Sequence, residues 1–177
     1  MRTRTCIDFD WRFELGDTHE AIRSDFDDSR WRQLDVPHDW SIEATPSPDN
    51  PAGPGGGFFP GGIGWYRKHI DLPELGDRRV LIEFDGVYMN GEVWCNGHFC
   101  GARPYGYSSF CYDLTPYLKN DEPACIAVRV DNSRQLNSRW YSGSGIYRHV
   151  WLTLVDPVRV DHWGTCVTTP EVSENEA

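Results

Sequence analysis

The sequence predicts an all-β protein, most naturally a two-sheet jelly-roll β-sandwich. Short stretches that alternate apolar and polar residues recur along the chain, and Gly, Pro, Asn or Asp turn signals separate most of them. No stretch shows the apolar period of a helix of ordinary length. Aromatic residues make up 14% of the chain, which suits a sheet protein because strands are enriched in Trp, Tyr and Phe.

The first expected strand runs from Ile7 to Leu15, where every second residue is apolar. One face should be buried and the other wet, as in an antiparallel sheet. A turn at residues 27–29 and a proline at Pro37 punctuate the next stretch. Residues 41–64 are rich in Pro and Gly and read as a long loop. We expect this loop to be poorly ordered in the chain alone, because its apolar residues need a partner surface.

The remaining elements follow in order. The hairpin is placed by Asn96-Gly97, a strong two-residue turn signal between two apolar arms. Pro116 suits the start of one helical turn after a strand. The expected strands cover residues 65–73, 78–87, 92–101, 108–118, 124–132 and 147–155, and a further strand starts within 158–170.

Composition excludes several function classes. The net charge is −10 and no Lys/Arg run occurs, which argues against nucleic-acid binding. No apolar run is long enough to span a membrane, and the N-terminus lacks the apolar core of a signal peptide. We therefore expect a cytoplasmic protein with no membrane partner.

The six cysteines form no C-x-x-C pair, so they predict neither a paired-cysteine zinc site nor a cofactor. We expect free thiols, with Cys95 and Cys100 close together across the hairpin. His38-Asp39 has no partner at ligand spacing and is interpreted as a turn with a solvated imidazole. The sequence thus predicts no metal site. The acidic residues show no pair that stands out as acid and nucleophile, so no catalytic residue is nominated.

Two clusters of planar side chains adjoin glycine runs. Residues 65–67 are Trp-Tyr-Arg, and residues 139–141 are Arg-Trp-Tyr beside Ser142-Gly143-Ser144-Gly145. Sugars present C–H faces that stack on aromatic rings and hydroxyls that suit Arg and Asn donors, so both clusters are candidate sugar contacts. An alternative for Arg139 is a structural clamp to Asp131.

Five motifs in order resemble the N-terminal domain of family 2 glycoside hydrolases, in the β-galactosidase branch, from about Ile7 to Thr169. These motifs are FDDSRWRQLDVPHDW, GGFFPGGIGWYRK, IEFDGVYMNGEVWCNGH, YDLTPYL and NSRWYSGSGIYRHVWL. The resemblance implies a galactose-binding-domain-like jelly roll over residues 1–157. It also implies that residues 158–177 begin a truncated immunoglobulin-like domain, and that the chain is a fragment of a longer protein.

For function, the resemblance implies a non-catalytic sugar-binding domain of a retaining β-galactosidase. The catalytic glutamates of this family lie in a downstream (β/α)₈ barrel, and loops of the jelly roll help to close the pocket around a terminal β-galactoside. The matching neighbourhood here is QLNSRW, which makes Asn137, Arg139, Trp140 and Tyr141 the candidate substrate-binding residues. The alternatives are a free-standing carbohydrate-binding module or lectin of the same fold, and a purely structural domain.

Overall fold

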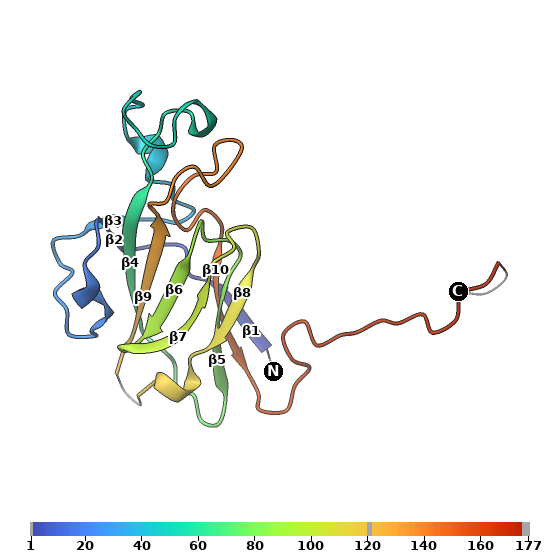
Figure 1. Cartoon of the computed structure of the whole chain (residues 1–177). Helices are drawn as coiled ribbons and strands as arrows, with labels where there is room; N and C mark the ends of the chain where they lie inside the picture. Colours follow the sequence, from blue (N-terminus) through green and yellow to red (C-terminus); the bar gives the residue numbers. More distant parts are fainter. Residues whose placement is uncertain (1, 120–121, 175–177) are drawn as a thin grey trace.

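The computed structural model describes residues 2–119 and 122–174. They form a jelly-roll sandwich of two antiparallel sheets (Figure 1), which confirms the predicted fold class. One sheet has four strands in the order β1–β10–β5–β8. These strands are β1 (Arg2–Cys6), β10 (Val150–Val155), β5 (Arg79–Phe84) and β8 (Phe110–Asp113).

The other sheet has six strands in the order β3–β2–β4–β9–β6–β7. They are β3 (Arg32–Leu34), β2 (Trp11–Leu15), β4 (Gly62–Ile70), β9 (Ala124–Asn132), β6 (Gly91–Cys95) and β7 (His98–Arg103). The pairing of β4 with β9 runs from Gly62 opposite Asn132 to Ile70 opposite Ala124. The loop before β4 and the loop after β9 therefore meet at one end of the sandwich.

The main core lies between the two sheets. β9 shows how the alternating pattern fills it: Ile126 and Val128 are fully buried in this core, whereas Ala127 belongs to a second cluster on the other face. Val80 and Ile82 of β5 are fully buried members of the same core. Each such side chain contributes about 1.5–3 kcal/mol by leaving water.

The second cluster covers the outer face of the six-stranded sheet. The segment that contains the short helix η1 (His19–Ile22) places Ala21 in this cluster with Trp65 and Trp94, whose rings stack with centroids 5.4 Å apart. Arg67 is fully buried under the same segment. The prediction that residues 65–67 form an accessible sugar-binding cluster is therefore wrong, because they lie within β4 and pair with β2 and β9 on its two sides.

The expected strand from Ile7 to Leu15 is shorter in the structure: only Trp11–Leu15 forms a strand, β2, and β1 ends at Cys6, before the expected start. β1 joins the four-stranded sheet, β2 joins the six-stranded sheet, and the chain crosses between the sheets at residues 7–10. Asp10 takes a left-handed backbone conformation (φ 60°) at this crossing, and Phe9 is 62% exposed. The alternating pattern continues through the crossing, which is why the sequence suggests one strand.

The predicted hairpin at Asn96-Gly97 joins β6 to β7, and both turn residues have positive φ, as this turn requires. The helical turn is the 3₁₀ helix η4 (Thr115–Tyr117), and the long loop contains two more, η2 (Ser41–Glu43) and η3 (Pro54–Gly56). All six cysteines are free. No helix in the described ranges is long and apolar enough to cross a membrane.

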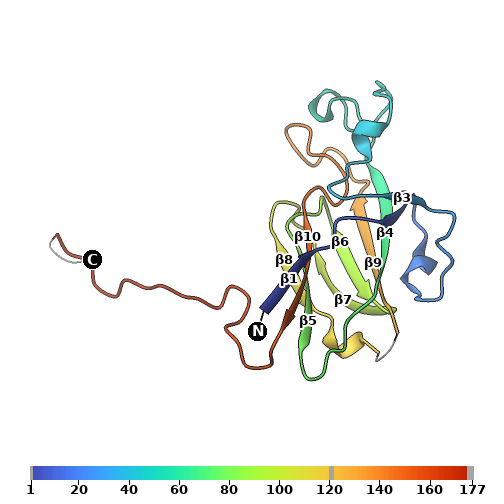
Figure 2. The same ribbon diagram turned by 180° about the vertical axis from the view of Figure 1, so that it is seen from behind.

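The described residues after β10 form no strand, so the expected strand within 158–170 is absent. This segment leaves the sandwich and runs out to one side (Figures 1 and 2). A domain boundary between residues 157 and 158 stays a prediction, as does poor order of residues 41–64.

Candidate functional site

The candidate site is the loop that follows β9, residues 133–145, which we call the glycine loop. It lies at the same end of the sandwich as the loop before β4 (Figures 1 and 2). Four of its 13 residues are Ser and two are Gly, and Ser and Asn side chains hydrogen-bond nearby backbone groups in place of strand partners. A bridge between Tyr88 and Gly145 closes the loop.

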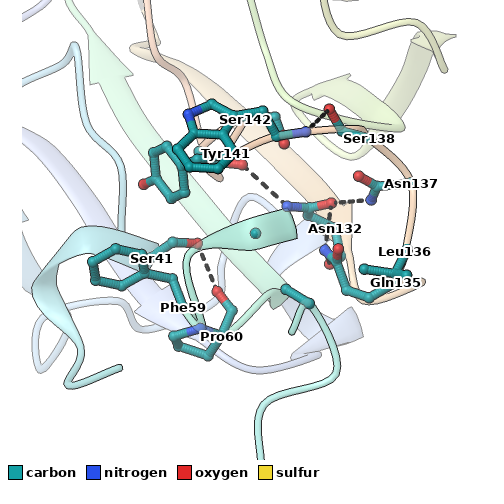
Figure 3. Close-up of a pocket in the computed structure, with 14 residues that line it drawn as sticks. Ser41, Phe59, Pro60, Asn132, Gln135, Leu136, Asn137, Ser138, Tyr141 and Ser142 are labelled. Carbon is teal, nitrogen blue, oxygen red and sulfur yellow. Dashed lines mark hydrogen bonds between the residues drawn. The ribbon is translucent and has the colours of Figure 1, made fainter. Parts of the chain in front are cut away.

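Asn132 is the centre of the hydrogen bonds that hold the glycine loop (Figure 3), and it is only 3% exposed. Its Nδ2 donates to Gly143 O at 3.0 Å and to Ser144 Oγ at 2.7 Å. Its Oδ1 accepts from Asn137 Nδ2 at 2.6 Å and from Gln135 Nε2 at 3.2 Å. One buried amide thus fixes both arms of the loop to the end of β9.

Asp39 ties the same loop to the segment that precedes the long loop. Its Oδ1 accepts from the backbone N–H groups of Ser41 at 3.0 Å and Ser144 at 2.8 Å. Its Oδ2 accepts a short hydrogen bond from the Tyr141 hydroxyl. Burial and this bond raise the pKa of Tyr141, so the hydroxyl stays protonated at neutral pH. The base of the loop is therefore held from two sides.

Two glycines allow this close approach. Gly143 (φ 75°) and Gly145 (φ 135°) both have backbone conformations that L side chains rarely adopt. A Cβ on Gly143 would lie 2.8 Å from Asp39 Oδ2, and one on Gly145 would lie 2.5 Å from His38 O. The glycine run is thus a tightly packed anchor of the loop and not a hinge.

The tip of the loop, in contrast, projects into solvent. Trp140 is 71% exposed and Leu136 is 70% exposed. The exposed Arg139 side chain makes no hydrogen bond or ion pair with any residue in 2–119 or 122–174. An exposed ring next to an unpaired guanidinium is suited to contact a partner that the described residues do not supply.

The four predicted site residues separate into two pairs. Asn137 and Tyr141 belong to the base, and Asn137 Oδ1 also accepts a hydrogen bond from Tyr88 OH at 3.2 Å. Arg139 and Trp140 form the exposed tip. The alternative of a clamp between Arg139 and Asp131 is wrong, because Asp131 pairs instead with Arg129 Nη2 at 3.3 Å.

A recess lies between the glycine loop and the loop before β4 (Figure 3). Phe59 and Pro60 line one side, and Asn132, Asn137 and Tyr141 line the other. Its free volume of about 20 Å³ holds one or two water molecules but no sugar ring. The recess is therefore too small to bind a monosaccharide by itself.

Sequence reasoning missed Asp39 and Asn132 as the residues that shape the site. The imidazole of His38 is also not solvated as expected: it is 8% exposed, and its Nδ1 lies 2.7 Å from Tyr66 OH. A signal was present for Asp39, since it and its partner Ser144 lie in two motifs of the resemblance, VPHDW and NSRWYSGSG; Asn132 lies in neither. Their contact across the fold is visible only in three dimensions.

Comparison with known proteins identifies the family. Residues 5–156 match the family model described as the sugar binding domain of glycosyl hydrolases family 2. The chain belongs to this family. A curated relative, the β-galactosidase BoGH2A of Bacteroides ovatus, is 57% identical over 99% of the chain, and a putative β-glucuronidase of Formosa agariphila is 43% identical over 99%.

A solved structure is similar to this chain in both sequence and fold. A β-glycosidase from Bacteroides vulgatus is 49% identical, with a TM-score of 0.85 over 88% of this chain and 20% of its own. The chain spans 21% of BoGH2A and 17% of the Formosa agariphila protein. In length this family 2 sugar-binding domain therefore corresponds to about a fifth of its relatives.

Proposed function

We propose that this chain is the non-catalytic N-terminal sugar-binding domain of a retaining β-galactosidase that hydrolyses terminal β-galactosides. In this proposal a (β/α)₈ barrel downstream supplies the catalytic glutamates, and an immunoglobulin-like domain beginning at residue 158 lies between. The glycine loop helps to close the active site of that barrel. The high identity to a protein named β-galactosidase supports this substrate class over glucuronides.

The observation that carries the proposal is the contrast within the glycine loop. Asn132 and Asp39 hold its base with buried and partly buried hydrogen bonds, whereas Arg139 and Trp140 stand exposed at its tip. Fixing a loop in this way reduces the entropy cost of binding at its tip. Because the adjoining recess is too small for a sugar ring, the tip is suited to complete a pocket that another domain provides.

At the tip, Arg139 can donate two parallel hydrogen bonds to neighbouring hydroxyls of a galactoside. Trp140 offers a flat apolar face for the C–H groups of the same sugar. Asn137 and Tyr141 support the tip indirectly, because their side chains are engaged in hydrogen bonds with Asn132 and Asp39.

A non-catalytic role agrees with the electrostatics. A glycosidase needs one carboxylic acid with a raised pKa beside an ionised carboxylate. Every carboxyl in the described ranges whose pKa is shifted has a lowered pKa, as at Glu43, where the hydrogen bond from Arg32 is the main cause. A cytoplasmic location is part of the proposal and is supported by the six free cysteines.

Two assays on the purified 177-residue chain test this assignment. We expect no turnover of a chromogenic β-galactoside, while the complete protein that carries the chain turns it over. Turnover by the chain alone that is lost on replacing one of its acidic residues would overturn the non-catalytic role. Submillimolar galactose binding by the chain alone, lost in Arg139→Ala, would instead favour the free-standing carbohydrate-binding module.

A further inference from the structure

Cys6, Asp8 and His149 form a cluster outside the glycine loop, where β1 ends and the chain crosses to the other sheet. The Cys6 sulfur, a carboxylate oxygen of Asp8 and a ring nitrogen of His149 all lie within 4.8 Å of one another. His149 Nδ1 is 2.6 Å from Asp8 Oδ2. We propose that these three side chains form a site for a divalent transition metal ion of the zinc type.

The donor set points to this class of ion. Sulfur, imidazole nitrogen and carboxylate oxygen together are the ligands of Zn²⁺ and Co²⁺, whereas Mg²⁺ and Ca²⁺ prefer oxygen alone. Three protein ligands leave a fourth tetrahedral position for water. That position can face solvent, because Cys6 is half-buried and the His149 side chain is 53% exposed.

The backbone around the cluster is fixed before any ion arrives. Asp8 Oδ1 accepts from Val150 N–H at 2.8 Å, which aims Oδ2 toward His149. Asp8 O accepts from Val36 N–H at 2.8 Å, and Ile7 N–H donates to Val150 O at 2.9 Å. A metal-binding carboxylate that is itself held by a backbone donor is typical of built metal sites.

Small side-chain movements suffice for coordination. Tetrahedral ligands at zinc bond lengths lie about 3.4–3.6 Å apart. The Asp8–His149 pair must open from 2.6 Å, and any pair now as far apart as the 4.8 Å limit must close by about an ångström. Rotation about side-chain bonds achieves both without a change in the strands. The Cys6 proton is released to solvent as the thiolate binds.

Cobalt titration of the purified protein under reducing conditions tests the site. Thiolate coordination gives a near-ultraviolet charge-transfer band, and the expected result is a saturable band that Zn²⁺ removes and excess Mg²⁺ does not. Cys6→Ser should abolish the band, and His149→Ala should weaken cobalt affinity by at least about tenfold. Cys166→Ser is the matched control, because Cys166 is exposed and lies outside the cluster; it should keep the band.

Asp8→Ala is not used, since loss of the bond to Val150 threatens folding. Circular dichroism of the metal-free variants shows whether each is folded. If Cys6→Ser does not fold, the cobalt affinity of His149→Ala tests the proposal instead. A band absent at millimolar Co²⁺ would overturn the proposal. A band that survives Cys6→Ser, or unchanged cobalt affinity in His149→Ala, would also do so and would leave the cluster as a hydrogen-bonded tie between strands.

Discussion

Two arginines with similar neighbours in the sequence have opposite environments in the fold. Arg67 follows Trp65-Tyr66 after a glycine run, and Arg139 precedes Trp140-Tyr141 before another. Arg67 is fully buried, and its Nε donates to Asp28 Oδ2 at 2.7 Å. Arg139 is exposed and has no side-chain partner in the described ranges.

The difference arises from strand pairing. Residues 65–67 lie between two neighbouring strands, so their side chains must point into the core or under the η1 segment. Residues 139–141 have no neighbouring strand, and only Tyr141 turns inward, to Asp39. An arginine next to aromatic residues and a glycine run can therefore be either structural or free to bind a ligand, and the sequence alone does not distinguish the two.

The largest expected effect is at Arg67. Arg67→Ala removes the Nε donor of the Asp28 carboxylate, which among the described residues keeps only His69 Nε2 at 3.1 Å, and removes a donor from three backbone carbonyls beneath the η1 segment. Breaking such a buried pair costs about 3–5 kcal/mol of unfolding free energy. Urea unfolding of the chain measures this cost. Arg139→Ala is the matched control and should change stability by less than about 0.5 kcal/mol. Equal losses of stability in Arg67→Ala and Arg139→Ala would contradict the distinction between a structural Arg67 and an unpaired Arg139.

A smaller effect is expected at Asp39, which holds the base of the glycine loop. Asp39→Ala removes the acceptor of Ser144 N–H, Ser41 N–H and the Tyr141 hydroxyl, and should cost about 1–3 kcal/mol. Limited proteolysis should then cut the loop faster. Asp49→Ala is the control, because Asp49 is exposed in the neighbouring loop. Unchanged proteolysis in Asp39→Ala would show that the loop is held by other contacts.

The smallest effect concerns pH. Burial lowers the pKa of His38 below its ordinary 6.5, although the Glu43 carboxylate acts in the opposite direction. Below about pH 6.5 the unfolded chain therefore binds more protons at this residue than the folded chain. The uncharged His38 therefore contributes stability that is complete above pH 6.5. This stability is lost as the pH falls from 6.5 toward the pKa of His38 in the folded protein.

Urea unfolding between pH 8 and pH 5 measures this loss. His38→Gln should flatten the part of the profile below pH 6.5, while His98→Gln, at an exposed position, should leave it unchanged. A profile in His38→Gln that matches the unmodified protein would contradict the assignment.

Much of the fold could be predicted because strand patterning and turn chemistry are local. The Asn96-Gly97 hairpin and the alternation of β9 are of this kind. The crossing at residues 7–10 was missed because the pattern continues through it while the partner sheet changes. Asp8, within this crossing, accepts a hydrogen bond from Val150 N–H, a contact far along the chain that the local pattern does not show.

The site could be predicted only in part for the same reason. The glycine loop and its four candidate residues were located from the resemblance and from their composition. The division between base and tip was not, because it depends on the hydrogen bonds that Asn132 makes within the loop and that Asp39 accepts from Ser144 across the fold. Single-residue chemistry identifies a possible contact, whereas burial decides whether the side chain is free to make it.

The most direct test of the account is the kinetics of Arg139 variants in the complete protein that carries this chain. Loss of a charged donor to the sugar should lower kcat/KM for a β-galactoside by about ten- to hundredfold in Arg139→Ala, at an unchanged melting temperature. Arg139→Lys should recover only part of this loss, because an ammonium cannot make the paired contact. A lower melting temperature with normal kcat/KM would contradict the account and make Arg139 a structural residue.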